Sequence, residues 1–279
     1  MIVFLNGDFL PAPRAKVSIL DRGFLYGDGL FETLRVTGGR LFRWAAHMRR
    51  LREGAAYLRL RLPISDETLL ERARELIRRN RLVEGLLRLT VSRGVGPPGY
   101  APPARGRPTL AMSVQRLDRA AAMPRWRLVT ASLRLTAGDP LARFKTCNKL
   151  PQVLARAEAV AAGADEALLL NTAGLAVEAA AANLFWIDRD TLCTPPLSSG
   201  ALPGVTRAAV LELCRAKGLP VREAAPRAGQ LRRAQGAFLT LSSRGIVEIS
   251  WLDGHSLPRS PWTLRLWEDY HQMLRSEAV

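Results

Sequence analysis

The chain has four lysines, and two of them stand where a lysine amine could act as a nucleophile. Lys145 and Lys149 lie in a short loop that opens a predicted helix, where partial desolvation would activate an amine. Lys16, in a polar N-terminal segment, and Lys217, at the end of a predicted helix, have adequate structural explanations. On these residues alone, a solvated surface lysine is the competing interpretation for Lys145 and Lys149.

Further segments at fixed distances from Lys145 strengthen the chemical interpretation. Upstream lie Asp21 to Thr33, Arg35 and His47 to Leu51, and downstream lie Asn148, Glu178 to Phe185, Thr194-Pro195 and Leu202 to Arg207. These segments occur in the order typical of one enzyme family. Over nearly its whole length the chain resembles the class IV aminotransferases, which are pyridoxal 5'-phosphate enzymes of fold type IV.

The resemblance implies roles for Lys145 and Glu178. Lys145 matches the family's lysine, which forms a Schiff base with the cofactor aldehyde and then moves a proton to and from the substrate carbon. Glu178 matches the carboxylate that keeps the pyridine nitrogen protonated, so that the ring accepts electrons. Lys149 is the local rival of Lys145, and an exposed turn glutamate is the alternative interpretation for Glu178.

The resemblance also implies a phosphate site, because a phosphate dianion needs a cation and several N–H or hydroxyl donors. Leu202 matches a side chain that packs on one face of the cofactor ring, although it could equally be a core leucine. The residues that match the phosphate-binding positions are Arg50, the backbone of Val205 and Thr206, and Ser242.

The substrate pocket matches no standard specificity of the family. The D-amino acid aminotransferases hold the substrate carboxylate with a tyrosine, an arginine and a histidine, and Phe31, Pro98 and Tyr100 occupy those positions here. The branched-chain enzymes have a tyrosine after the asparagine near the lysine, where this chain has Lys149. We expect amino transfer between an amino acid and a 2-oxo acid, with handedness and side-chain preference undetermined.

The alternative activity is that of aminodeoxychorismate lyase, which several motifs of the sequence resemble. Its resemblance lies in Ser92-Arg93-Gly94, Gly99-Tyr100, Asn148 to Leu154 and Ala181 to Trp186. Those lyases release pyruvate and leave 4-aminobenzoate. Pro98 departs from their pattern, because an arginine often precedes the Gly-Tyr pair.

Donors for a substrate carboxylate must come from elsewhere in the chain. Arg35, Arg105 and Arg107 are candidates, the last two on a Pro/Gly loop over residues 94–108. The length of that loop is typical of a lid, a binding loop or a disordered segment. Ordinary surface arginines are an equally good interpretation of all three. Tyr26, Phe31, Tyr100 and Ser243 are the further candidates for the pocket wall.

The formal net charge of +16 raises a different class of function, nucleic-acid binding. Of 41 basic residues only four are lysines, and the arginines are scattered without a basic run or a Gly-Arg repeat. An arginine-rich solvated surface explains this composition better than a nucleic-acid site does.

The remaining composition predicts a cytoplasmic protein without a membrane span, a leader or a metal. No apolar run reaches 18 residues, and His47, His255 and His271 are too far apart in sequence for a metal site. We interpret His47 as a structural helix residue. The three cysteines are odd in number and show no close spacing, so they indicate neither a disulfide framework nor a zinc site. This fits a reducing compartment.

Hydrophobic periodicity and turn residues predict the elements that must position these groups. Asn6-Gly7 predicts a hairpin within residues 1–10, and Ser65 predicts an N-cap for a helix over 66–79. Other predicted helices are 44–58, 151–162 and 205–217. The other predicted strands are 30–36, 40–42, 86–92, 109–115, 126–135, 166–170, 182–187 and 237–241.

Strands that alternate with helices indicate an α/β (α+β) fold. We predict an N-terminal α/β domain over 1–120 and a larger cofactor-binding domain over 121–279. The resemblance implies the two-domain fold type IV, whose larger domain is a mixed, barrel-like sheet with helices. It also implies a homodimer with active sites near the subunit interface.

Overall fold

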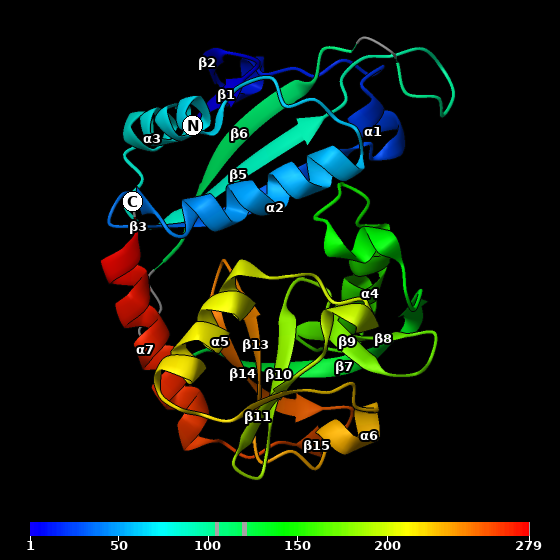
Figure 1. Ribbon diagram of the computed structural model, residues 1–279, viewed down its shortest axis with the longest axis vertical. Coiled ribbons are helices and arrows are strands. Elements are labelled where there is room, and N and C mark those ends of the chain that lie inside the picture. The colour runs from blue at the N-terminus through cyan, green and yellow to red at the C-terminus, as the bar shows by residue number, and fades with distance from the viewer. Residues whose placement is uncertain (104–105, 119–121, 279) are drawn as a thin grey trace. The chain divides into compact units, whose positions relative to one another are not determined.

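The computed structural model describes residues 1–103, 106–118 and 122–278, which form two compact units (Figure 1). The first unit comprises residues 1–119 together with 144–148 and 274–279. The second comprises residues 120–143 and 149–273. Two short segments from the later part of the chain therefore belong to the first unit, and one of them carries Lys145.

The first unit is a six-stranded antiparallel sheet in the order β2-β1-β6-β5-β3-β4. Its strands are β1 (Ile2–Leu5), β2 (Asp8–Pro11), β3 (Gly29–Thr37), β4 (Arg40–Leu41), β5 (Gly85–Ser92) and β6 (Thr109–Arg116). Its helices are α1 (Arg22–Tyr26), α2 (Trp44–Tyr57) and α3 (Asp66–Arg79), with a 3-10 turn at Ala12–Arg14.

Local sequence explains several of these boundaries. Asn6 and Gly7 have φ of 52° and 111°, which suits the tight β1–β2 hairpin. The side chain of Ser65 accepts a hydrogen bond from the Thr68 amide, so α3 begins where the capping pattern predicts. Helix α2 packs on β3, and α3 packs on β1 and β6, around a core that includes Leu34, Leu51 and Leu76.

The second unit contains a closed barrel. The strand order β10-β13-β14-β7-β8-β9 returns to β10 through a β9–β10 pairing, so six strands close on themselves, with β11 and β12 extending from β10. The strands are β7 (Arg125–Leu135), β8 (Glu166–Asn171), β9 (Ala176–Ala179), β10 (Asn183–Asp188), β11 (Thr191–Thr194), β12 (Val221–Glu223), β13 (Ala237–Leu241), β14 (Gly245–Leu252) and β15 (His255–Ser256).

Helices pack on the outside of this barrel, and small residues of α4 allow it to pack closely. Ala155 and Ala159 of α4 are fully buried against Ala131 and Leu169 of the barrel strands. The helices are α4 (Leu150–Ala161), α5 (Val205–Ala216), α6 (Ala228–Leu231) and α7 (Pro261–Glu277), and the 3-10 turns are Pro140–Arg143 and Leu197–Ser199. The last turn of α7 belongs to the first unit.

The predicted mixed α/β class and the barrel-like second half are confirmed. Within the described residues, no helix combines the length and the hydropathy that a membrane crossing requires.

Candidate active site

Lys145 is held at the edge of the first sheet. The Phe31 amide donates to the Lys145 carbonyl at 2.9 Å, and the Cys147 amide donates to the Gly29 carbonyl at 2.9 Å. The segment 144–148 therefore lies alongside the start of β3, where β4 does not reach. The Lys145 side chain is half-buried, and its Nζ lies 4.7 Å from the centroid of the Phe31 ring.

A buried ion cluster lies on the α2 side of the same strand. Arg50 Nε and Nη2 donate to the two carboxylate oxygens of Glu32 at 2.8 and 2.5 Å, and His47 Nδ1 lies 2.6 Å from Glu32 Oε2. Burial by itself would raise the pKa of Glu32, but Arg50 and then His47 outweigh it and lower this pKa to about 2.

Within this cluster the side chains of Arg50 and His47 are both held by the Glu32 carboxylate. Burial is the largest cause of the lowered pKa of His47, and the charge of Lys145 contributes in the same direction. His47 is therefore held by Glu32, as a structural helix residue would be. Sequence reasoning missed Glu32, although it is the one acidic residue in the otherwise mostly apolar strand β3.

Phe31 contacts a second cation that sequence reasoning also missed. The guanidinium carbon of Arg88, on β5, lies 3.8 Å from the Phe31 ring centroid. Arg88 and Lys145 thus each lie within cation–π distance of the same Phe31 ring. The signal was weak in the sequence, because Arg88 is one of many arginines in the chain.

Arg35 lies toward the other end of β3 and is engaged there. Its Nη2 donates to Glu84 Oε2 at 2.5 Å, while Thr37 donates to the other oxygen of the same carboxylate. Phe31 pairs with Thr90 along the β3–β5 ladder, and Arg35 pairs with Leu86. The side chains of Phe31 and Arg35 therefore lie well apart along β3. The structure therefore brings Arg88, and not Arg35, to Phe31.

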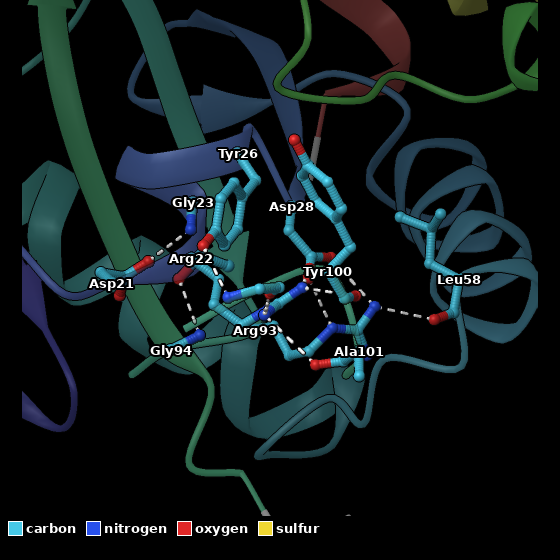
Figure 2. A network of polar contacts seen from close by, with 12 residues as sticks. Asp21, Arg22, Gly23, Tyr26, Asp28, Leu58, Arg93, Gly94, Tyr100 and Ala101 are labelled. Atoms are coloured by element: carbon cyan, nitrogen blue, oxygen red, sulfur yellow. Dashed lines mark hydrogen bonds and ion pairs between the residues drawn. The ribbon is translucent and has the colours of Figure 1, made fainter. Parts of the chain in front are cut away.

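The 94–108 loop is anchored in its first part by a polar network around α1 (Figure 2). Arg22, which is 3% exposed, donates to Asp28 and to the carbonyls of Gly99, Tyr100 and Ala101. Arg93 donates to both oxygens of Asp28. Burial opposes the charge on Asp28, but the hydrogen bonds from Arg93 and Arg22 leave its pKa lowered.

This anchor brings two of the candidate pocket residues together. Tyr26 accepts a hydrogen bond from the Gly99 amide at 3.2 Å, and its ring meets that of Tyr100 edge to face at 5.6 Å. Arg107 is exposed, and Arg105 lies outside the described residues.

In the second unit, Glu178 lies on β9 with one carboxylate oxygen held by two donors. The Leu202 amide donates to Oε2 at 2.9 Å, and Asn183 Nδ2 donates to the same oxygen at 3.2 Å. Leu202 is thereby fixed beside Glu178, and only Pro203 and Gly204 separate it from helix α5.

Helix α5 presents an N-terminus suited to an anion. It begins at Val205 with Gly204 as N-cap, no side chain caps it, and its first turn holds no acidic residue. Val205 and Thr206 are buried. A helix N-terminus and a carboxylate thus lie close together in one unit.

Ser242 and Ser243 lie in the turn between β13 and β14, and both are half-buried. Thr240, two residues earlier, faces Asn183 across the β10–β13 ladder and is 2% exposed. Its Oγ1 has no hydrogen-bond partner within the described part of the chain. Sequence reasoning missed Thr240, and its buried hydroxyl is available to donate to a water or a bound ligand.

Known proteins resemble this chain over almost its full length. The amino-transferase class IV family profile matches residues 29–251. A Methanocaldococcus jannaschii protein, provisionally named a branched-chain-amino-acid aminotransferase, is 35% identical over 91% of this chain and 88% of its own. The D-alanine aminotransferase of Bacillus licheniformis is 29% identical over 92% of this chain and 90% of its own.

Solved structures of class IV enzymes have the same fold as this chain. The branched-chain amino acid aminotransferase of Escherichia coli superposes with a TM-score of 0.93 at 27% identity, covering 100% of this chain and 96% of that one. A Legionella pneumophila protein, provisionally named a 4-amino-4-deoxychorismate lyase, superposes with a TM-score of 0.86 at 30% identity, covering 94% and 97%. These matches confirm the predicted family and favour an enzyme over the nucleic-acid-binding alternative. The chain belongs to the class IV aminotransferases, a family of pyridoxal phosphate-dependent enzymes that includes a lyase relative.

Proposed function

We propose that this protein binds pyridoxal 5'-phosphate and transfers an amino group between an amino acid donor and a 2-oxo acid acceptor. The observation that carries the proposal is the second unit's pairing of the Glu178 carboxylate with the uncapped N-terminus of α5. When bound, the cofactor supplies an electron sink for the substrate carbon.

The residues of the second unit fit that group. Glu178 would meet the protonated ring nitrogen, and its Oε2 is already oriented by two protein donors. The amides of Val205 and Thr206, Ser242 and the buried hydroxyl of Thr240 would donate to the phosphate. Leu202 would cover one ring face. By their match to the family's sequence positions, Arg50 would add a cation, and Lys145 would supply the amine that holds the cofactor and moves the proton.

For the substrate carboxylate we propose Arg88 in place of Arg35. Arg88 reaches the Phe31 ring that Lys145 also contacts, whereas Arg35 is paired with Glu84. Tyr26 and Tyr100 would form part of the pocket wall, and Arg105, Arg107 and Ser243 remain candidates from the sequence.

Borohydride reduction tests the cofactor and the lysine together. We expect the purified protein to be yellow, to bleach on reduction, and to yield a peptide with the cofactor on Lys145. Replacement of Lys145 by Ala should lower turnover by about a thousandfold or more with the fold intact, while Lys149→Ala serves as the control. Labelling of Lys149, or full activity of Lys145→Ala, would refute the assignment.

Aminodeoxychorismate lyase is the second candidate, because a lyase relative shares the fold at 30% identity. Incubation with D- or L-amino acids in the absence of a 2-oxo acid should convert the cofactor stoichiometrically to its amine form if the enzyme is a transaminase. Catalytic release of pyruvate from aminodeoxychorismate would instead identify a lyase.

We also propose a homodimer in the cytoplasm. Exposed apolar side chains support a partner surface on each unit, including Ile19 and Phe24 in the first and Leu150 and Val153 on α4 in the second. Cys193 and Cys214 are buried free thiols, as expected in a reducing compartment. Sedimentation analysis should show a dimer that Phe24→Glu or Val153→Glu weakens, and a monomeric wild-type protein would refute the proposal.

A further inference from the structure

Asn183 occupies the position where the barrel closes. It is the first residue of β10, and it faces Glu178 of β9 on one side and Thr240 of β13 on the other. Residues directly opposite in antiparallel ladders share a face of the sheet, so these three side chains form a row across three strands. Asn183 is 6% exposed, and its amide therefore needs partners within the protein.

The amide of Asn183 finds two acceptors. Nδ2 donates to Glu178 Oε2 at 3.2 Å and to the Leu202 carbonyl at 2.8 Å. Leu202 returns a bond from its own amide to Glu178 Oε2 at 2.9 Å. Asn183, Glu178 and Leu202 thus form a closed set of contacts, in which the orientation of the carboxylate depends on both donors.

The other end of the Asn183 amide lies against the start of α5. A Cβ added to Gly204 would lie only 1.9 Å from Asn183 Oδ1, so the backbone of the N-cap residue approaches this oxygen as closely as only a glycine allows. Gly204 has an ordinary φ of −69°, so close approach, and not backbone conformation, is what requires glycine here.

We infer that Asn183 is a positioning residue that sets the Glu178 carboxylate relative to the N-terminus of α5, so that one bound molecule meets both. The inference rests on the proposed function, since a pyridoxal phosphate has a cationic ring nitrogen at one end and a phosphate at the other. Asparagine suits the task because a single side chain donates to Glu178 and Leu202 while its oxygen lies beside Gly204.

The decisive variant is Asn183→Asp, which keeps the shape and replaces the donor by an acceptor. Two carboxylates at hydrogen-bond distance share a proton at low pH and repel each other once both ionise. The nearby charged side chain on α5, Arg207, is already engaged by Glu223 and the Pro195 carbonyl. The carboxyl introduced by Asn183→Asp is therefore expected to act as a donor to Glu178 only when the pair is protonated.

The measurement is the affinity of the apoprotein for pyridoxal phosphate, followed by absorbance or fluorescence across a pH series. We expect Asn183→Asp to bind pyridoxal phosphate at least about tenfold more weakly than the wild type does at alkaline pH. This difference in affinity should become smaller as the pH falls. Asn183→Ala should lose affinity without this pH dependence. Equal affinity of Asn183→Asp and wild type at every pH would overturn the inference, and so would identical losses for the Asp and Ala variants.

A matched control is Asn171→Asp. Asn171 is 2% exposed in the same unit and bonds to Ser199, Ala173 and Leu175, so its replacement should lower stability and leave cofactor affinity unchanged. Equal loss of affinity in this variant would reduce Asn183 to a structural residue and overturn the inference.

Gly204→Ala gives a second, independent route if Asn183→Asp fails to fold. Its Cβ would displace the Asn183 amide, so its effect on cofactor affinity should be smaller in an Asn183→Ala background than in the wild type. Additive losses would contradict the coupling.

Failure of the proposed function can be distinguished from failure of the inference about Asn183. If the wild type binds no pyridoxal phosphate, the thermal stability of the apoproteins still tests the Asn183 contacts. In folded Asn183→Asp, the new carboxyl and Glu178 would hold a proton that the unfolded chain releases, so the stability deficit of this variant should grow as the pH rises. A deficit that is independent of pH would overturn the placement of Asn183 against Glu178.

Discussion

The guanidinium of Arg22 lies 2.9 Å from the carboxylate of Asp28 and at the same time donates to three successive carbonyls, those of residues 99–101 (Figure 2). Asp28 orients this buried cation. A second arginine, Arg93, donates to both oxygens of the same Asp28 carboxylate. The first part of the Pro/Gly loop is therefore held by side chains of the first unit.

Removal of this guanidinium should loosen the loop. In Arg22→Ala, we expect the amides of residues 99–101 to exchange with deuterium at least about tenfold faster, because several hydrogen bonds to the loop are lost. Arg22→Lys should restore part of the protection. Arg78→Ala, at an exposed i,i+3 pair on α3, is the control and should leave the loop unchanged. Unaltered exchange in Arg22→Ala would show that the loop is held by other contacts.

Glu32 should stabilise the fold in a pH-dependent way. Its pKa in the folded protein is about 2 against an ordinary 4.5, so its contribution is complete above about 4.5 and is lost as the pH falls toward 2. Glu32→Gln should abolish this acid dependence, at a cost on the order of 3 kcal/mol at neutral pH. Urea unfolding at several pH values measures it.

Glu75 is the matched control for Glu32. Its pKa is also lowered to about 2 by the adjacent Arg78 and Arg79, but the pair is solvent-screened on α3. Glu75→Gln should therefore leave the acid profile nearly unchanged. An equal effect of both substitutions would show that burial of the Glu32 cluster does not matter.

Gly27 should tolerate a side chain poorly, because it combines a positive φ with a close contact. Its φ is +66°, and an added Cβ would lie 2.3 Å from Asn148 Oδ1, in the segment that carries Lys145. Gly163 has the same φ and open space around it. Gly27→Ala should thus destabilise the protein by about 1 to 3 kcal/mol more than Gly163→Ala does, as measured by chemical unfolding. Equal losses would show that Asn148 moves aside freely.

Arg88 should affect substrate use, and Arg35 should affect stability. If Arg88 meets the substrate carboxylate, Arg88→Ala should lower kcat/KM for the amino acid by about 10- to 100-fold, mainly through KM, with little change in Tm. Arg35→Ala should instead lower Tm, because it leaves Glu84 without its cation. The reverse pattern would restore Arg35 as the substrate residue.

Several elements were predictable because their signals are local. The α3 helix runs over the predicted residues, since Ser65 caps it and its apolar positions repeat with helical spacing. The Asn6-Gly7 hairpin and the β3, β5 and β10 strands also lie where residue pattern placed them. Helix α7, at Pro261–Glu277, was not predicted, and neither was β9, which is only four residues long.

The sequence by itself determined the family, the fold class and the residue types that a pyridoxal phosphate enzyme needs, because these depend on short motifs and on local hydrophobic spacing. Tertiary structure alone decided which side chains meet: Arg88 at Phe31, Glu32 between His47 and Arg50, and Asn183 between Glu178 and Thr240. Those pairings join residues from different strands and helices, and strand register and barrel closure set them through packing across the whole unit.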